Sequence, residues 1–342
     1  GNQYIFRQDF LKMKNTFIAK LCLMVLLIIT FISCATDELK VVKYEITDVI
    51  QQLPLDTLNY FQGPHSIRVL HDTLYIADQN NNRVVILSKD FQYAKTIGQH
   101  GKGPSEFSSP SAVLPYNDSV YVFDRGNSRI QIFDKKREYV GGFNIPIYPK
   151  SMPALTNRGN ILMRAMGGVD DSALFQELDP KGEIVANIGI PSDQDNSIPF
   201  VSNLVSLETD NADNRYAAFY ELPIIRKYNS SGELLWETNF YSFDRISNRA
   251  KEIEDRKKAS PSMWSSLILD ISLSEDRLYV LFSLGDKYRN IYGLDTRTGK
   301  IVERVDTDGS EHFKLSMDFV DDRLYFVDYG SDVLVKATRV KS

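Results

Sequence analysis

Short apolar runs, each introduced by a polar turn, recur along most of the chain. Their residues are mainly β-branched and aromatic, which favour strands, and the runs are too short for helices. Six of them align on one five-residue pattern, at positions 74–78 (LYIAD), 120–124 (VYVFD), 161–165 (ILMRA), 216–220 (YAAFY), 278–282 (LYVLF) and 324–328 (LYFVD). Their first residues lie 46, 41, 55, 62 and 46 positions apart. The pattern predicts a repeated strand-rich unit.

Each unit contains further apolar runs around this one. One lies before the polar turn, at 66–70, 111–114, 151–155, 201–207, 267–273 and 315–319. In the first five units a third run ends at a second tight turn and a fourth follows it, at 93–97, 139–143, 184–188, 234–240 and 301–305. Four-stranded units with a period of about 40 to 50 residues are typical of β-propellers. We therefore predict an all-β, six-bladed β-propeller over residues 41–342.

The two ends of the repeat complement each other. The sixth unit stops after its third strand, at 333–339, and an apolar run at 41–46 precedes the first unit. We predict that this N-terminal strand completes the sixth blade and closes the ring, which removes an exposed strand edge.

One insertion interrupts the repeat between blades 4 and 5, at about 242–260. Phe243, Ile246, Ala250 and Ile253 follow one another at spacings of three and four, which indicates an amphipathic helix that ends before Pro261. The helix packs on the rim of the ring beside Trp264, or it forms a lid over the central pocket.

The N-terminus carries an export pattern. Residues 21–33 (LCLMVLLIITFIS) are uncharged, follow Lys14 and Lys20, and are too few to span a bilayer. The sequence FISC that ends at Cys34 resembles a bacterial lipobox, in which the cysteine becomes the lipidated first residue. We interpret 1–12 as upstream residues, 13–33 as a lipoprotein signal peptide and 34–40 as a lipidated tether. An ordinary signal peptide or a buried hydrophobic helix are the alternatives.

Composition and charge exclude several classes of function. The 342 residues are 25% charged and 43% hydrophobic, as in globular proteins. Without residues 1–33, 36 basic residues face 44 acidic ones, so the net charge changes from −5 to −8. This surface lacks the basic footprint of nucleic-acid binding. Cys22 leaves with the signal and Cys34 carries the lipid, which excludes thiol catalysis and thiolate metal sites.

The first two blades carry a more specific motif. Residues 72–87 (DTLYIADQNNNRVVIL), 97–113 (IGQHGKGPSEFSSPSAV) and 118–134 (DSVYVFDRGNSRIQIFD) resemble the NHL-type six-bladed propellers. Together with the lipobox they resemble the propeller lipoproteins common in Bacteroidetes. The resemblance implies the fold and an envelope location. It implies no activity, because blades 3 to 5 replace the strand-end Asp by Ala165, Tyr220 and Phe282.

Loop lengths distinguish the two faces of the predicted ring. The connections from second to third strands, and from one blade to the next, open on the same face. They include the long segments 100–109, 165–172, 189–200, 241–266 and 283–290. Long loops on a rigid scaffold commonly bind ligands. We therefore expect binding on this long-loop face.

First strands line the axis of a propeller, so their polar residues are candidate ligand contacts. Arg164 adds a charge at the end of an apolar strand, and Trp264 lies beside the insertion. The candidate ligand-binding residues are His65, Arg68, Lys150, Arg164, Asn203, Trp264, Asp270 and Lys314. The alternative is that they only solvate a water-filled channel.

Three aspartates occupy equivalent strand ends in adjacent blades: Asp78, Asp124 and Asp328. Converging carboxylates would suit Ca²⁺ or a general acid. Arg83 and Arg129 follow the first two at a spacing of five, however, so each pair is predicted to fix its own strand connection. No cofactor is predicted, and Ca²⁺ is the metal considered for these aspartates.

These observations favour a non-catalytic, lipid-anchored binding propeller of the cell envelope, located at the outer membrane. Its partners are the membrane, through the lipid, and a glycan, peptide or outer-membrane protein, with no nucleic acid. The chain lacks a P-loop and a GxSxG motif. A metal-dependent lactonase- or lyase-like enzyme and a structural scaffold of an outer-membrane complex are the alternatives.

Overall fold

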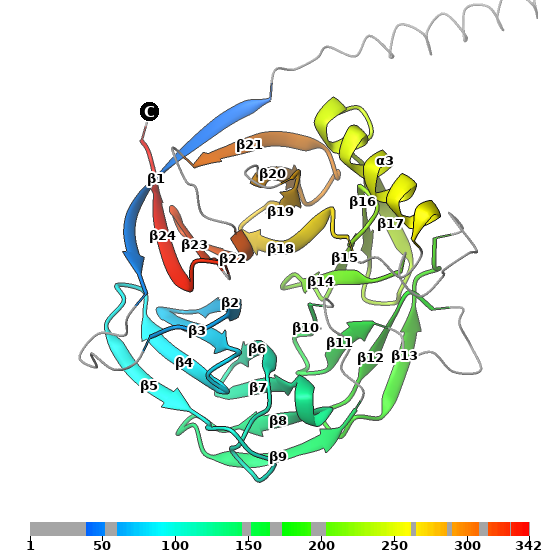
Figure 1. The fold of residues 1–342 in the computed structure, drawn as a ribbon. Coiled ribbons are helices and arrows are strands. Elements are labelled where there is room, and N and C mark those ends of the chain that lie inside the picture. Colours follow the sequence, from blue (N-terminus) through cyan, green and yellow to red (C-terminus); the bar gives the residue numbers. More distant parts are fainter. Residues whose placement is uncertain are drawn as a thin grey trace, which may run out of the picture. The chain divides into compact units, whose positions relative to one another are not determined.

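The structure is a computed structural model that describes residues 39–51, 60–145, 152–164, 173–192, 203–260, 265–285, 289–307, 314–328 and 330–341. From Lys40 onward the chain forms one unit, in which four-stranded blades surround a common axis (Figure 1). This confirms the predicted all-β six-bladed propeller.

In blades 1 to 5 the strands follow one another outward from the axis in chain order, and in blade 6 the order is β22, β23, β24 and then β1 (Figure 1). The strands of the first three blades are β2 (Pro64–Leu70), β3 (Thr73–Asp78), β4 (Arg83–Ser88) and β5 (Tyr93–Ile97); β6 (Pro110–Tyr116), β7 (Ser119–Asp124), β8 (Arg129–Phe133) and β9 (Tyr139–Asn144); β10 (Ala154–Leu155), β11 (Ile161–Arg164), β12 (Phe175–Leu178) and β13 (Ile184–Ile188). A short 3-10 helix, η1 (Arg125–Asn127), follows β7.

The remaining blades follow the same plan. Their strands are β14 (Val205–Thr209), β15 (Arg215–Phe219), β16 (Ile224–Tyr228) and β17 (Leu234–Asn239); β18 (Ile268–Ser274), β19 (Arg277–Ser283), β20 (Arg289–Asp295) and β21 (Ile301–Thr307); β22 (Lys314–Val320), β23 (Arg323–Asp328), β24 (Val333–Arg339) and β1 (Lys40–Ile50).

The burial of the second strands explains their composition. Strands such as β3 and β7 are buried on both faces, because each blade is packed between two neighbours, and they are almost continuously apolar. Outer strands such as β9 and β17 are largely exposed, although they carry apolar residues such as Val140 and Leu235. The core therefore consists of apolar wedges between adjacent blades.

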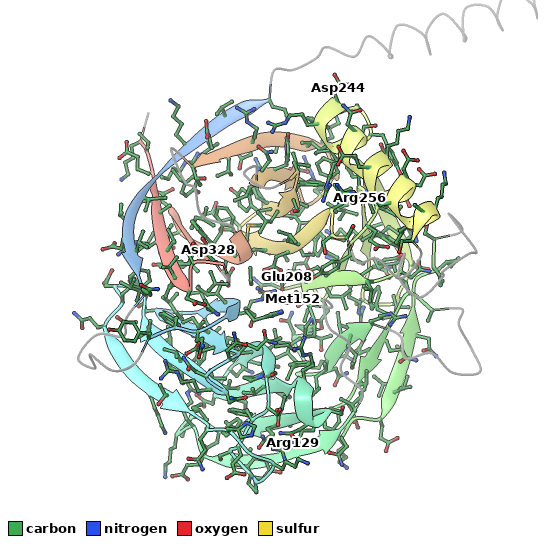
Figure 2. All side chains as sticks on the ribbon, viewed as in Figure 1. Arg129, Met152, Glu208, Asp244, Arg256 and Asp328 are labelled. Atoms are coloured by element: carbon green, nitrogen blue, oxygen red, sulfur yellow. The ribbon has the colours of Figure 1, made fainter. Side chains whose placement is uncertain are left out.

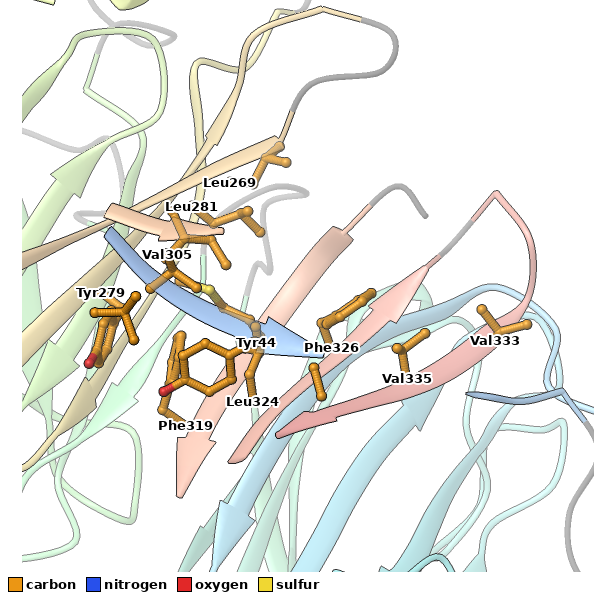
Figure 3. Packing of buried hydrophobic residues seen from close by; sticks show 14 residues of the cluster. Tyr44, Leu269, Tyr279, Leu281, Val305, Phe319, Leu324, Phe326, Val333 and Val335 are labelled. Carbon is orange, nitrogen blue, oxygen red and sulfur yellow. The ribbon is translucent and has the colours of Figure 1, made fainter. Parts of the chain in front are cut away.

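Strand β1 closes the ring as predicted. It pairs antiparallel with β24, which makes it the fourth strand of blade 6, and its first residues also pair in parallel with β21 of blade 5. Figure 3 shows its Tyr44 among the buried residues of both blades. The Tyr44 side chain is 2% exposed, and its ring meets that of Phe319 edge to face, with ring centroids 5.8 Å apart. One strand thus joins blades 5 and 6 into a single eight-stranded sheet.

Tight turns join first to second strands at one end of the axis, which we name the short-turn end. In four blades the turn has two residues, and the first of them has a positive φ: His71, Asn117, Glu275 and Asp321. Asn and Asp tolerate this left-handed region better than most residues. Turn geometry therefore explains part of the polar character of this end.

The insertion forms helix α3 (Asp244–Ala259), within the predicted range. It lies along the outer side of blades 4 and 5 (Figure 1) and buries Ile246 and Ile253 against them. Lys257 forms an ion pair with the buried Glu221 of blade 4. These contacts favour a packed surface helix over a lid. No helix in the described ranges is long and apolar enough to cross a membrane.

Candidate functional site

The six first strands contribute two layers of side chains near the axis. The pocket layer comprises residues that pair with Tyr75, Tyr121, Leu162, Tyr216, Tyr279 and Tyr325 of the second strands: Arg68, Leu114, Ala154, Glu208, Ser272 and Asp318. The second layer, toward the long-loop end, comprises Ser66, Ala112, Met152, Ser206, Asp270 and Ser316.

An ion pair joins the two layers and connects blades 1 and 5. Nη1 and Nη2 of Arg68, from blade 1, donate to Oδ2 and Oδ1 of Asp270, from blade 5, each at 3.2 Å. Arg68 is 7% exposed and Asp270 is 0% exposed. Such a bidentate pair is stronger and more directional than a single charged hydrogen bond. Two of the predicted ligand contacts therefore bind each other.

The carboxylate of Asp270 also holds neighbouring blades. Ser316 Oγ and the Met317 N–H donate to its Oδ2 at 2.7 and 3.0 Å, and Ser206 Oγ donates to its Oδ1 at 3.4 Å. Blades 1, 4, 5 and 6 thus share one carboxylate. Burial alone would lower the pKa of Arg68, but the charges of Asp270, Glu208 and Asp318 raise that pKa above its ordinary value.

A cavity of about 400 Å³ lies at the short-turn end of the axis, and we name it the channel pocket. All six blades line it: Arg68, Val69, Leu70, Leu114, Pro115, Tyr116, Pro153, Ala154, Leu155, Thr156, Asn157, Glu208, Thr209, Asp210, Asn211, Leu273, Glu275 and Asp318. Asp270 is not part of the lining, so its ion pair with Arg68 closes the inner end. The volume lies within the range of small-molecule sites.

Two carboxylates of the pocket layer have perturbed acidities. Burial, together with the charges of Asp318 and Asp270, raises the pKa of Glu208 to about 7, although Arg68 opposes this shift. Burial likewise raises the pKa of Asp318, against the charge of Arg68 and the hydrogen bond from Ser272. In Figure 2, Glu208 lies at the centre of the ring. Perturbed carboxylates in a cavity are typical of functional sites.

The other predicted contacts lie toward the long-loop end. His65 Nδ1 is 2.8 Å from the carbonyl oxygen of Ser111, and burial lowers the pKa of His65 to about 4, so the ring is neutral at pH 7. The side-chain oxygen of Asn203 accepts a hydrogen bond from the Ser192 N–H at 2.7 Å. Arg164, at the end of β11, is 6% exposed, and Lys314 begins β22. Cys34, Lys150 and Trp264 lie outside the described residues.

The strand-end aspartates accept hydrogen bonds within their own strand connections. Asp78 Oδ2 accepts from Arg83 Nε at 2.7 Å, and Asp124 Oδ2 accepts from Arg129 Nε at 2.8 Å. Asp328 Oδ1 accepts from the backbone of its own loop. Figure 2 places Arg129 toward the periphery. Among the described residues no three His, Cys, Asp or Glu side chains form a group that could hold a metal ion. The contacts favour loop fixation for Asp78 and Asp124.

Sequence reasoning missed Glu208 and Asp318, although a signal was present. Five of the six second strands place a tyrosine beside the pocket layer. Aligning on that tyrosine places Tyr216 with Tyr75, one position away from the sequence alignment given above. Phe219, and not Tyr220, is therefore the counterpart of the strand-end Asp in blade 4. With this register, Glu208 and Arg68 occupy equivalent positions.

The fold and this axial site define a β-propeller of six four-stranded blades. The profile of a family described as 6-bladed beta-propeller matches residues 28–327, and the chain belongs to this family. None of the curated proteins matches the sequence significantly.

Solved structures share the architecture at low sequence identity. An exported protein of Bacteroides fragilis, so described in its name, superposes with a TM-score of 0.58 at 15% identity, over 88% of this chain and 100% of that one. Virginiamycin B lyase from Staphylococcus aureus gives 0.52 at 13% identity, over 86% and 99%. Its inactive variant with quinupristin gives 0.53 at 14% identity, over 90% and 97%. At this identity the similarity establishes the fold alone.

Proposed function

We propose that this chain is a lipid-anchored binding protein of the cell envelope that holds a small polar ligand in the channel pocket. The observation that carries the proposal is the pocket itself. Six blades converge on about 400 Å³, and a buried ion pair closes its inner end. A rigid ring loses little conformational entropy on binding, which favours ligand recognition.

The sequence supports the envelope location. An uncharged run, 21–33, precedes Cys34 directly, as in lipoprotein signal peptides. The similar protein from Bacteroides fragilis is described as exported. Glycans and peptides are the ligand classes of interest, because both present the polar groups that this pocket can bind. The anchor would keep such a binding protein at the membrane surface.

A pocket-filling variant tests the proposal. Leu273 lines the channel pocket and is partly buried, so Leu273→Trp places an indole in the cavity. Leu235→Trp, at an outer-strand position that is 51% exposed, is the matched control. We expect native mass spectrometry and thermal-shift screening with sugars, amino acids, amines and short peptides to identify a ligand. Leu273→Trp should abolish its binding and Leu235→Trp should not.

Two results would contradict this proposal. Binding that is unaffected by Leu273→Trp would place the ligand elsewhere on the propeller. A folded protein that binds nothing in the screen and carries no ligand from its source would favour the structural-scaffold alternative.

One observation favours a second candidate function, an acid–base enzyme. A carboxyl group with a pKa of about 7, as in Glu208, can both donate and accept a proton at neutral pH. Two similar structures are virginiamycin B lyases by name, and one of these was solved with quinupristin. Turnover of quinupristin that Glu208→Gln abolishes would support the enzyme. Binding of the identified ligand without any chemical change in it would support the binding protein.

A further inference from the structure

The charges of the channel pocket are strongly unequal. Among the described residues its lining contains one cation, Arg68, and four carboxylates, Glu208, Asp210, Glu275 and Asp318. The cation is already paired, because both terminal nitrogens of Arg68 bind Asp270, which lies outside the lining. The pocket therefore presents a negative surface to any ligand.

Two of the four carboxylates belong to blade 4: Glu208 lies on β14 and Asp210 lies in the turn after it. They differ in the number of hydrogen bonds and ion pairs that they form. Asp210 is engaged by Asn214 and Tyr216 and lies 3.6 Å from the ammonium of Lys227. Glu208 accepts one hydrogen bond among the described residues, from the Thr209 N–H to Oε1 at 3.0 Å, and Oε2 receives none. A carboxylate can accept about four hydrogen bonds. The partly buried Glu208 thus has an oxygen available in the cavity.

Asp318 lines the pocket from blade 6 and is held by three hydrogen bonds. Its Oδ1 accepts from Ser272 Oγ at 2.7 Å and from the Phe319 N–H at 2.9 Å, and its Oδ2 accepts from the Val69 N–H at 2.7 Å. The residue is 9% exposed. Turn geometry accounts for acidic residues in the surrounding turns, but Glu208 and Asp318 lie within strands, where acidic residues are disfavoured. Their positions therefore need another explanation.

From the cavity, its charge balance and these two carboxylates, we propose that the channel pocket selects a small molecule carrying a protonated amine, held between Glu208 and Asp318. This assignment rests on the proposed function and names its ligand class. An ammonium group supplies three donors and one positive charge, which satisfies the available oxygen of Glu208 and offsets its repulsion with Asp318. A cavity of about 400 Å³ accommodates an amino sugar or a short diamine.

The acidic turns around the entrance of the channel pocket also favour cationic ligands. The two-residue turns of blades 1, 2, 5 and 6 contribute Asp72, Asp118, Glu275, Asp276, Asp321 and Asp322. Asp72, Asp276 and Asp322 form ion pairs with Lys89, Arg277 and Arg339, which offset part of this charge. The remaining negative charge raises the local concentration of cationic solutes and speeds their association.

The ionisation of Glu208 links binding to pH. Among the described residues, the groups that face it are Arg68 from β2, Tyr116 from β6, Asp210 from its own turn, Tyr216 from β15, Asp270 and Glu275 from β18 and its turn, and Asp318 from β22. The described part of blade 3 contributes no titratable residue to the lining. With a pKa of about 7, Glu208 is mostly protonated at pH 6 and mostly ionised at pH 8. Amine affinity should therefore rise about tenfold between pH 6 and pH 8.

Matched probes test the assignment. Isothermal titration calorimetry at pH 8 and low salt compares putrescine with 1,4-butanediol, and cyclohexylamine with cyclohexanol, because both amines remain protonated at this pH. We expect the amines to bind and their neutral counterparts to bind at least tenfold more weakly. Glu208→Gln should weaken amine binding about tenfold and remove its dependence on pH. Glu254→Gln, which removes an exposed carboxylate on the outer helix α3, is the control and should change affinity less than twofold.

Several outcomes would overturn cation selection. Equal affinity for an amine and its neutral counterpart would do so, as would amine binding that Glu208→Gln leaves unchanged. If only neutral or anionic molecules bind and Leu273→Trp abolishes that binding, the proposed function stands and the amine assignment fails. If trilysine binds more than a hundredfold more tightly than putrescine, the ligand is a basic peptide and not a small amine.

Discussion

Replacing Asp270 with alanine should destabilise the propeller strongly, because this carboxylate is the main partner of a buried cation. The Arg68 guanidinium would keep its 2.7 Å hydrogen bond to the Ile67 carbonyl oxygen but lose both bonds to Asp270. Breaking a buried ion pair by removing one partner costs about 3–5 kcal/mol. The nearby charges of Glu208 and Asp318 partly compensate, so we expect a loss of about 3 kcal/mol in the free energy of unfolding.

Removing the other partner of the ion pair, Arg68, should cost less stability. In Arg68→Ala, Asp270 remains buried but keeps donors from other residues, among them Ser316 Oγ, the Met317 N–H and Ser206 Oγ. Loss of a hydrogen bond to a charged group costs about 1.5–3 kcal/mol, and the remaining donors favour the lower value. The structure therefore predicts an order, with Asp270→Ala more damaging than Arg68→Ala.

Equilibrium urea unfolding, followed by tryptophan fluorescence, measures both changes. Lys258→Ala is the control, because its ion pair with Glu254 is exposed on α3 and should contribute less than about 0.5 kcal/mol. The double variant, with alanine at both Arg68 and Asp270, should be no less stable than Asp270→Ala, because it no longer contains the buried, unpaired guanidinium. If Arg68→Ala proves as damaging as Asp270→Ala, the reasoning about the unpaired guanidinium is wrong.

Four further outcomes follow from the structure. Tyr44→Ala, in the strand that closes the ring, should cost about 3–5 kcal/mol in urea unfolding, whereas Val41→Ala, at a position that is 46% exposed, should cost little; equal effects would contradict closure by β1. Glu208→Gln should stabilise the protein at pH 8 by up to about 3 kcal/mol. The pKa of Glu208 in the folded protein is about 7, above its ordinary value, so the ionisation of Glu208 costs stability as the pH rises from 4.5 to 7. No gain in stability would mean that Glu208 is not desolvated. The folded pKa of His65 is about 4, below its ordinary value, so stability should fall as pH drops from 6.5 to 4, and His65→Asn should reduce this fall in a pH series of melting temperatures. Cys34→Ala should move the protein from the membrane to the soluble fraction of fractionated cells, and unchanged fractionation would refute the lipid anchor.

The sequence was sufficient to predict the scaffold because each blade repeats one pattern of burial. The predicted strands 93–97 and 184–188 match β5 and β13, and the closing strand lies where the incomplete sixth unit required it. The first strand of blade 3 is shorter than predicted, Ala154–Leu155 in place of 151–155. Pro153 lacks an N–H for the ladder, which explains part of this difference.

The candidate site was only partly predictable. Alternation along a strand indicates that Arg68 and Asp270 face the axis, but their ion pair joins residues 202 positions apart. No local pattern determines which first strands meet across a ring. Glu208 was missed because the predicted strand ended at 207, whereas β14 continues to Thr209. Binding was expected on the long-loop face, where 165–172 and 286–288 lie outside the described residues, whereas the described pocket lies at the opposite end.

The break in the repeat at the pocket layer has a physical cause that bears on function. A true sixfold repeat would place six identical side chains around one axis. Six carboxylates or six guanidinium groups so close to the axis would repel one another. The second strands lie away from the axis and are free to repeat, as five equivalent tyrosines do. Charged positions on the first strands must diverge, and the divergence from Arg68 to Glu208 and Asp318 creates the charge pattern of the pocket. In this fold, strict periodicity therefore indicates the scaffold, and polar departures from it on the first strands indicate the candidate ligand site.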